Sequence, residues 1–322
     1  MKQEYISTAN FVFDTEIDAL KRIDKNLGDT FVKIVEIVNN CEGKVVVTGM
    51  GKSGHIARKA AATFSSLGIC SIFLHPAEAQ HGDLGMVQKN DVVIAMSYSG
   101  ESTELIKILP NLKKIGTKII GITANPNSSL SKYTDVCEVF PEIIEACHLG
   151  LAPTTSTTAT LVYCDAIAVA VSKSRNFKKT DFGLYHPAGS LGKKLIYTVK
   201  DLMDGREKNA TIMEHSFIKD AIFEMSEKGL GIITVINNKN EIVGILTDGC
   251  IKRSIENNIN IYETKIDDFI ITDVIYINDD AMAIDALKIM IENNINSMPV
   301  LKDNNVVGVI RKNEIIKIGI YL

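Results

Sequence analysis

Residues 44–55 read Lys44-Val45-Val46-Val47-Thr48-Gly49-Met50-Gly51-Lys52-Ser53-Gly54-His55. A β-branched run comes first, and a glycine-rich turn follows it. Apolar runs of this kind are typical of strands in a parallel sheet that is buried on both faces. The glycines have the spacing G-x-G-x-x-G, which lets backbone amides approach an anion where a helix begins. The segment therefore predicts a buried strand that ends in an anion-binding turn, with Lys52 beside it.

Two nucleotide-binding folds share parts of this pattern, and neither fits it fully. A nicotinamide site needs an acidic residue at the end of the second strand to hold the ribose, and the sequence offers Leu74-His75-Pro76 there. A P-loop needs its first glycine at the position of Val46, inside the strand. The turn is therefore expected to bind an anion in another kind of site.

Four further β-branched runs follow, at residues 71–74, 91–96, 118–122 and 136–140. Five runs with helical patterns between them predict an α/β domain with a doubly wound, five-stranded parallel sheet. Ahead of it, apolar residues at helical spacing predict a helical lead-in that packs on the sheet or on another subunit. The expected boundaries are 1–30 for the lead-in, 31–177 for the α/β domain and 178–202 for a linker.

The sequence repeats itself after the linker. Ile218-Lys219-Asp220-Ala221 recurs as Ala283-Ile284-Asp285-Ala286, and Ile242-Val243-Gly244-Ile245-Leu246 recurs as Val306-Val307-Gly308-Val309-Ile310. Matched anchors at both ends of a unit indicate two copies of one fold, each reading helix, strand, turn, strand, helix. We expect two small α/β repeats, at 203–262 and 268–322.

Composition and charge exclude several classes of protein. The formal net charge of -4 argues against a nucleic-acid groove, which needs clustered Lys and Arg. The N-terminal residues include acids and no continuous apolar segment, so we expect a cytoplasmic protein without a secretory signal. The richest apolar stretch, Leu161 to Val171, is too short to span a membrane and is interrupted by Asp165. The six cysteines form no C-x-x-C pair and are expected to be buried, reduced thiols.

Two hydroxyl-rich segments follow later strands. They read Ser97-Tyr98-Ser99-Gly100-Glu101-Ser102-Thr103-Glu104 and Pro153-Thr154-Thr155-Ser156-Thr157-Thr158-Ala159-Thr160. An ordinary N-cap uses one hydroxyl and leaves the others unexplained. Hydroxyls and free amides at a helix start together form a cup for a phosphate. We expect the ligand at the carboxyl ends of the strands, where these segments begin.

With these motifs the chain resembles sugar isomerase (SIS) domains, and specifically bacterial D-arabinose 5-phosphate isomerases, in which a tandem pair of CBS modules follows the SIS domain. Five segments carry the resemblance: Gly49 to His55, His75 to Met86, Ser99 to Ser102, Gly150 to Thr160, and His186 to Gly189. The resemblance covers the chain from about residue 30 onward. It implies a flavodoxin-like sheet followed by two CBS repeats.

The resemblance implies an aldose-ketose isomerase that interconverts D-ribulose 5-phosphate and D-arabinose 5-phosphate through an enediol and supplies Kdo synthesis for lipopolysaccharide or capsule. Such a reaction needs a base, a cation or donor for the enediolate oxygen, and a phosphate anchor. By motif, the catalytic candidates are Lys52, His81, Glu104, Glu145 and His186. The substrate-binding candidates are Gly51, Ser53, His75, His81, Ser97, Ser99, Ser102 and Thr103.

The resemblance leaves the division of roles open. Lys52 is expected to stabilise negative charge on the enediolate or the phosphate, and His81 or His186 to assist ring opening and proton transfer. Glu104 and Glu145 are both candidate bases, and the sequence does not rank them. The apolar neighbours of Glu145 are expected to raise its pKa by partial burial.

The resemblance implies no required cofactor and suggests an inhibitory zinc ion at His75. The alternative is that His75 merely caps the second strand. A homo-oligomer is expected, and the resemblance favours a tetramer.

The C-terminal pair departs from nucleotide-binding CBS modules. Cys250 stands where a ribose-binding Asp is usual, and Arg311 stands where the second repeat needs a hydroxyl. Regulation by adenylates is therefore doubtful, and packing or recognition of a nucleotide-sugar is favoured. Two other functions remain open for the whole chain: a regulator that senses a phosphosugar without turnover, and a lyase or amidotransferase that uses the same phosphate cup.

Overall fold

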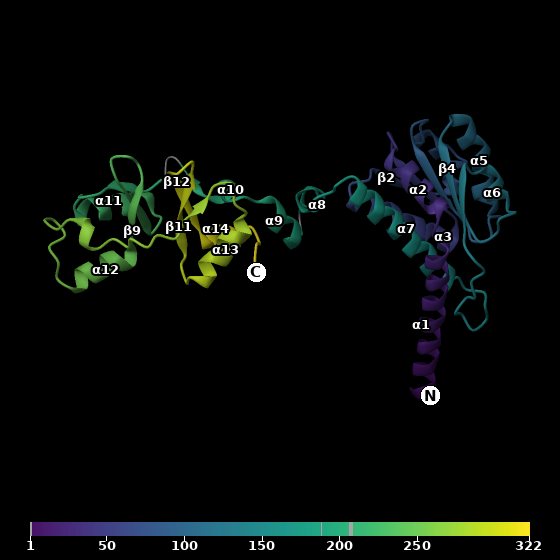
Figure 1. Cartoon of the computed structure of the whole chain (residues 1–322), viewed down its shortest axis with the longest axis horizontal. Coiled ribbons are helices and arrows are strands. Elements are labelled where there is room, and N and C mark those ends of the chain that lie inside the picture. Colours follow the sequence, from purple (N-terminus) through teal and green to yellow (C-terminus); the bar gives the residue numbers. More distant parts are fainter. Residues whose placement is uncertain (1, 188, 206–208) are drawn as a thin grey trace. The chain divides into compact units, whose positions relative to one another are not determined.

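The computed structural model describes residues 2–187, 189–205 and 209–322 (Figure 1). These residues form two compact units. The first unit ends at Phe182, and the second begins at Gly183. Each unit is built around hydrophobic cores of its own.

A five-stranded parallel sheet forms the centre of the first unit. Its strands are β1 (Val45–Gly49), β2 (Ser71–Leu74), β3 (Val92–Met96), β4 (Lys118–Thr123) and β5 (Val136–Val139). They lie in the order β2-β1-β3-β4-β5, and each neighbouring pair is parallel. This is the flavodoxin-like order of a doubly wound sheet. The predicted fold of this domain is confirmed.

Helices cover both faces of the sheet. They are α1 (Lys2–Lys25), α2 (Asp29–Asn39), α3 (Gly51–Ser66), α4 (Pro76–Ala79), η1 (Asp83–Met86), α5 (Thr103–Ile115), α6 (Ser129–Tyr133) and α7 (Thr155–Ser174). Val45 and Val47 pack in a core with α2, α3 and α7, whereas Val46 packs in a second core with α5 and α6. Successive side chains of a strand point to opposite faces, so this alternation places one helical layer on each side.

Most of α1 extends beyond the packed body of its unit, as Figure 1 shows. Ala19 and Ile23 are the buried residues of this helix. Tyr5, Phe11 and Phe13 are each more than half exposed. The predicted helical lead-in therefore contacts the sheet domain only through its last turns and leaves apolar side chains exposed.

The second unit contains the two predicted repeats. The first consists of α11 (Ile218–Lys228), β8 (Ile232–Ile236), β9 (Ile242–Thr247) and α12 (Asp248–Glu256), and the second of α13 (Ala283–Glu292), β11 (Ser297–Lys302), β12 (Asn305–Arg311) and α14 (Lys312–Lys317). An extra strand joins each repeat in parallel, β7 (Thr211–Met213) beside β8 and β10 (Ile277–Asn278) beside β11. The internal sequence repeat is thus a repeat of structure.

Short elements complete this part of the chain. They are α8 (Lys179–Tyr185), α9 (Ser190–Ile196), α10 (Val199–Leu202), β6 (Asp204–Gly205) and η3 (Ile266–Asp268). Strand β6 pairs with β12, which gives the second repeat a four-stranded sheet in the order β10-β11-β12-β6. The first repeat has the three-stranded sheet β7-β8-β9.

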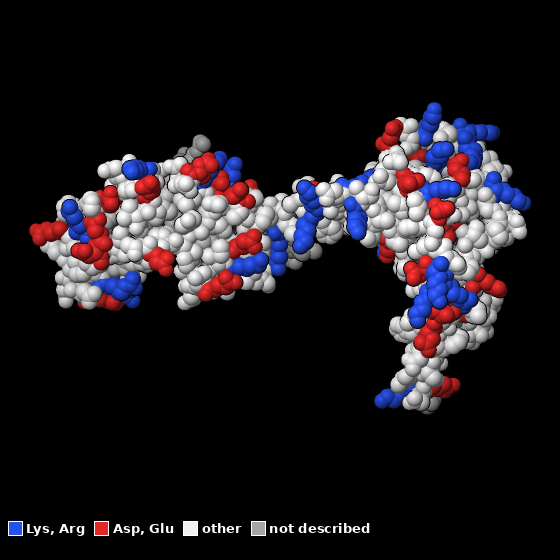
Figure 2. All heavy atoms as spheres, viewed as in Figure 1, with Lys and Arg blue, Asp and Glu red and all other residues white. Residues whose placement is uncertain are grey.

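The surface agrees with the charge pattern of the sequence. Acidic and basic side chains are interspersed on the face that Figure 2 shows. Among the described helices, none is long and apolar enough to cross a lipid bilayer.

All six cysteines are free, but only Cys164 and Cys250 are buried, and Cys70 is exposed. The expectation that all of them are buried is therefore wrong.

Candidate active site

The candidate site lies where the strand order of the first unit reverses. Strand β1 has β2 on one side and β3 on the other, and Gly49 pairs with Met96 at the carboxyl ends of β1 and β3. Ligands of open α/β sheets bind in the crevice outside such a reversal. The turn at residues 50–51 and the turn at residues 97–102 both begin there, so two predicted anion-binding segments meet at one edge of the sheet.

Close packing explains the glycines at the start of α3. A Cβ on Gly54 would stand 2.6 Å from the carbonyl oxygen of Gly49, so only glycine lets α3 approach β1 this closely. Gly51 has a φ of 55°, in the left-handed region. Lys52 follows in the first turn, exposed to solvent and without a hydrogen bond or ion pair within the described part of the chain.

The second turn is held by its own serines. Ser97 is buried, its hydroxyl accepts a hydrogen bond from the Gly100 amide at 3.1 Å, and it lies 2.9 Å from the hydroxyl of Ser102. Ser99 is exposed and its hydroxyl accepts from the Glu101 amide at 3.3 Å. Gly100 has a φ of 72°. The buried Ser97 thus holds the turn from the interior of the domain, while Ser99 lies on the side of the turn that faces solvent.

Helix α5 begins with an uncapped first turn. Ser102 is its N-cap, but the Ser102 side chain accepts no hydrogen bond from the helix amides, and Thr103 and Glu104 follow in the first turn. The half-buried Glu104 carboxylate has no hydrogen-bond or ion-pair partner among the residues described. Amides of a first helical turn have no acceptor within the helix, so they are free for an anion.

Glu101 serves a different helix. Its carboxylate accepts a hydrogen bond of 2.7 Å from the Ser129 amide at the start of α6. This backbone hydrogen bond lowers the pKa of Glu101. The two acids of the turn therefore differ in their contacts. Glu101 caps α6, whereas Glu104 makes no such contact in the described part of the chain and can act as a base.

Glu145 faces the start of α7. Its carboxylate accepts from the Thr154 amide at 2.8 Å, from the Thr154 hydroxyl at 3.1 Å and from the Ser156 amide at 3.3 Å. Burial alone would raise the pKa of Glu145, but these hydrogen bonds outweigh it and lower the pKa. The expectation of a raised pKa is therefore wrong. The second hydroxyl-rich segment is expected to bind a phosphate, and in the structure its amides and one hydroxyl bind the protein's own Glu145 carboxylate instead.

Tyr98 connects the segment that carries Glu145 to the turn at residues 97–102. Its hydroxyl donates to the Ile143 carbonyl at 3.3 Å and accepts from the Ile143 amide at 3.1 Å. Burial raises the pKa of Tyr98, so the phenol stays neutral and its hydroxyl can both donate and accept a hydrogen bond. Sequence reasoning missed this residue, although it lies inside a quoted motif.

The histidines are dispersed. His75 is half-buried at the N-cap of α4, with no side-chain capping bond, and its Nδ1 is buried without a partner among the described groups. Glu78 is exposed within α4, and His81 is exposed on the turn that follows. In the described residues no group of three or more His, Cys, Asp or Glu is placed to hold a metal ion. His186 belongs to the second unit, so its place in the site stays a prediction.

Comparison with known proteins identifies the family. Residues 39–170 match the SIS domain, and residues 199–257 and 266–320 each match the CBS domain. The arabinose 5-phosphate isomerase KdsD of Salmonella typhi is 42% identical over 96% of this chain and 94% of its own length. That of Pseudomonas aeruginosa is 39% identical over 98% of each chain. The chain belongs to the arabinose 5-phosphate isomerase family. The solved complex of E. coli CFT073 c3406 with arabinose 5-phosphate is 44% identical, with a TM-score of 0.57, and covers 58% of this chain and 100% of that one.

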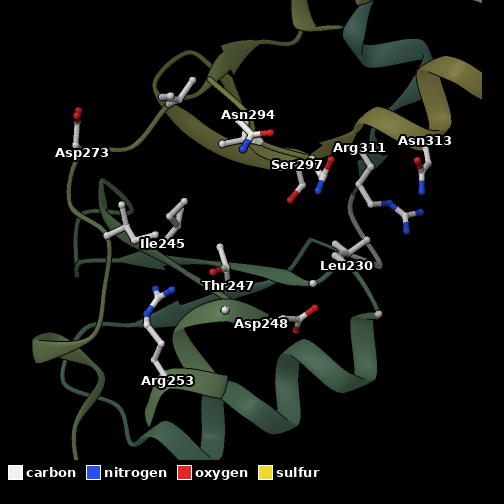
Figure 3. A pocket seen from close by; sticks show the side chains of 17 residues that line it. Leu230, Ile245, Thr247, Asp248, Arg253, Asp273, Asn294, Ser297, Arg311 and Asn313 are labelled. Carbon is white, nitrogen blue, oxygen red and sulfur yellow. The ribbon is translucent and has the colours of Figure 1, made fainter. Parts of the chain in front are cut away.

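In this member of the arabinose 5-phosphate isomerase family, a cavity lies between the two CBS repeats. It has a volume of about 690 Å³. Figure 3 shows Thr247, Asp248 and Arg253 of the first repeat on one side, with Asn294 and Ser297 of the second repeat opposite. Polar and apolar groups share its lining, and a concave site with convergent polar groups is typical of small-molecule binding.

The two arginines of this cavity differ. Arg311 is neutralised by Asp204 at 2.8 Å and by Glu314 at 3.3 Å. Arg253 donates to the Cys250 thiol at 3.3 Å and has no acidic partner within the described chain. A ligand anion would therefore meet Arg253 in preference to Arg311.

Proposed function

We propose that this chain converts D-ribulose 5-phosphate into D-arabinose 5-phosphate and back. One observation carries the proposal: α3 and α5 begin without side-chain caps at the carboxyl ends of neighbouring strands, with Lys52 and Glu104 in their first turns. Free amides at these helix starts bind the phosphate. A cation and an unengaged carboxylate beside them supply what an enediol reaction requires.

The proton transfers follow from these groups. Starting from the ketose, the Glu104 carboxylate removes a proton from C1, and the electron pair of that C–H bond forms the C1–C2 double bond. The carbonyl oxygen on C2 becomes an enediolate oxygen, which the Lys52 ammonium group stabilises. The Glu104 carboxyl group then returns the proton to C2, and the new C–H bond takes the electron pair of the C1–C2 double bond. The proton of the C1 hydroxyl passes to the C2 oxygen, so C1 becomes the aldehyde and the C2 oxygen becomes a hydroxyl. In the reverse direction, His81 or His186 assists ring opening of D-arabinose 5-phosphate.

The hydrogen bonds of Glu145 support a ranking of the two carboxylates. Glu145 is held by three donors from the start of α7, and its lowered pKa makes it a weaker base. Glu104 has no such donors in the described part of the chain. We therefore assign the proton abstraction to Glu104 and a positioning role beside Tyr98 to Glu145.

The phosphate contacts are divided between the two turns. Gly51 and Ser53 offer amides at the start of α3, and Ser99, Ser102 and Thr103 offer groups at the start of α5. Because the Ser97 hydroxyl is buried and bonded within the turn, its contribution is to hold the Gly100 amide in place. His75 contacts the sugar from the side of β2.

Solvent isotope incorporation tests the proposed chemistry. When the reaction runs in deuterium oxide, the returning proton exchanges with solvent, so D-arabinose 5-phosphate should carry deuterium at C2. Glu104→Gln should slow this incorporation about a hundredfold or more, and Glu145→Gln by less than about tenfold. Product without deuterium would contradict exchange of the abstracted proton with solvent and would indicate its direct return or a hydride shift. Equal losses in the two variants would contradict the ranking of the carboxylates.

The setting of the reaction is proposed on the same basis. We infer a cytoplasmic enzyme whose product supplies Kdo synthesis for lipopolysaccharide or capsule. The exposed apolar residues of α1, including Tyr5, Phe11 and Phe13, support a homo-oligomer, and a tetramer is the proposed state. No cofactor is required, and zinc bound at His75 is proposed to inhibit.

The CBS cavity is proposed to bind a nucleotide-sugar effector. Its volume of about 690 Å³ is sufficient for such a ligand. The guanidinium of Arg253 would take the acidic group. Measuring the binding of a nucleotide-sugar by calorimetry with the full chain and with Arg253→Met tests this assignment, which is contradicted if the two affinities are equal.

A further inference from the structure

A small cavity beside the first glycine turn is not explained by the reaction as described. It has a volume of about 210 Å³ and lies on the β2 side of the turn. The residues that line it are Met50, Gly51, Gly54, His55, Arg58, Phe73 and His75. Three of these side chains bear nitrogen and one is a phenyl ring, so the cavity combines polar recognition with a rigid wall.

Three side chains form a stack along one wall. The guanidinium of Arg58 lies 4.6 Å above the centre of the Phe73 ring. The Phe73 and His75 rings meet edge to face, with centroids 6.2 Å apart and an angle of 69° between their planes. Cation–π contacts and edge-to-face pairs both favour one orientation of the rings involved. The stack therefore fixes the orientation of the His75 ring.

The sequence explains why these three residues meet. Phe73 and His75 are two positions apart at the end of β2, so they share one side of the strand. Arg58 stands one helical turn after Gly54, and a Cβ at Gly54 would lie 3.8 Å from the Phe73 ring, so this face of α3 is in van der Waals reach of β2.

The stack positions a nitrogen that lacks a partner. The Nδ1 atom of His75 is buried and has no hydrogen-bond partner in the residues described. A buried polar atom left unpaired is destabilising, so the arrangement is expected to be completed by a ligand. Arg58 has no ion-pair partner in the described chain either, so its guanidinium is available for the ring contact.

We propose that Arg58 and Phe73 are positioning residues that hold the His75 ring toward the Gly51 turn, where its ring nitrogen contacts a hydroxyl of the sugar phosphate. A hydroxyl both donates and accepts, so it satisfies Nδ1 in either tautomer of the imidazole. The inference rests on the proposed isomerase function. It adds that two residues without a contact to the sugar of their own, Arg58 of α3 and Phe73 of β2, set the orientation of the His75 ring.

A double-mutant cycle with the full-length chain tests this inference. Arg58→Met keeps the apolar stem and removes the guanidinium from the ring. It should lower kcat/KM about three- to tenfold, mostly through KM. In a His75→Ala background the same change should lower it less than about twofold, because the positioned ring is gone. Lys59→Met is the matched control, since Lys59 is the next residue of α3 but pairs with Asp165 at 2.6 Å.

A purely structural role for Arg58 would give equal losses in both backgrounds, and that result would overturn the inference. A normal kcat/KM in His75→Ala would overturn it as well. Arg58→Lys, which keeps a cation over the ring, should recover part of the loss.

An NMR measurement distinguishes a failure of this inference from a failure of the proposed function. In the chain labelled with ¹⁵N-histidine, adding D-arabinose 5-phosphate should shift the His75 ring nitrogen signals, identified among the six histidines by their loss in His75→Ala. Arg58→Met should reduce that shift, and Lys59→Met should not. If the chain bound the sugar phosphate without turnover, the isomerase proposal would fail while these shifts remained. If turnover were normal but the His75 signals did not move, the positioning proposal alone would fail.

Discussion

The carboxylate of Glu145 accepts a hydrogen bond of 2.8 Å from the backbone amide of Thr154, which stands immediately before α7. A carboxylate at a helix start interacts favourably with the free amides and with the helix dipole. The relationship links the stability of the domain to the ionisation of one residue that the family resemblance places in the active site.

The first prediction concerns Glu145→Gln. Loss of the charge should lower the free energy of unfolding by about 1 kcal/mol at neutral pH, as for other helix caps. Because the folded pKa of Glu145 is lowered below its ordinary value of 4.5, the stabilisation is present above pH 4.5 and is lost as the pH falls through the folded pKa. The wild type and the variant should therefore converge in acid. Denaturant unfolding at several pH values measures this, and a constant difference down to about pH 3 would contradict it.

The second prediction concerns Lys52→Ala. A cation fixed at the enediolate or the phosphate contributes about 2 to 4 kcal/mol to the transition state, so turnover should fall about a hundredfold or more. Lys59→Ala removes another exposed lysine of the same helix and should leave turnover within about twofold. A folded Lys52→Ala protein with most of its rate would show that Lys52 is only a surface charge.

The central strands β1, β3 and β4 were predictable from the sequence because each is a continuous apolar run that is buried almost throughout. The β2 run at residues 71–74 matches its strand completely. The internal repeat was predictable for a similar reason, since Gly244 and Gly308 fall at equivalent positions of β9 and β12. Local patterns suffice where local packing decides the structure.

The environment of Glu145 was not predictable in the same way. Its apolar neighbours in sequence suggested burial and a raised pKa, but its hydrogen-bond donors come from Thr154 and Ser156, across a loop. Likewise, nothing in the hydroxyl-rich turn shows that Ser97 faces the interior while Ser99 faces solvent. Such contacts depend on how a loop folds back, which no periodicity records.

The third prediction is that turnover does not require a metal. The proposed reaction moves protons only, so exhaustive chelation should leave the rate unchanged. Added zinc should inhibit the wild type, and His75→Ala should be less sensitive. Activity that vanished on chelation and returned only with zinc would contradict the prediction.

The fourth prediction concerns the CBS repeats. A chain that ends at Tyr197 retains each residue proposed for catalysis, so its turnover should stay within about tenfold of the full chain. The solved relative c3406 supports this expectation, because its whole length aligns with 58% of this chain. Truncation should instead alter the oligomeric state or remove the response to a nucleotide-sugar. Loss of activity in a folded truncation would show that a CBS residue completes the site.

The most direct test of the account is to incubate the pure full-length chain with D-ribulose 5-phosphate and to follow the sugar phosphates by NMR. We expect D-arabinose 5-phosphate to accumulate, and we expect the same equilibrium mixture when the reaction starts from D-arabinose 5-phosphate. Binding of either sugar phosphate without interconversion would contradict it and would indicate a phosphosugar sensor instead.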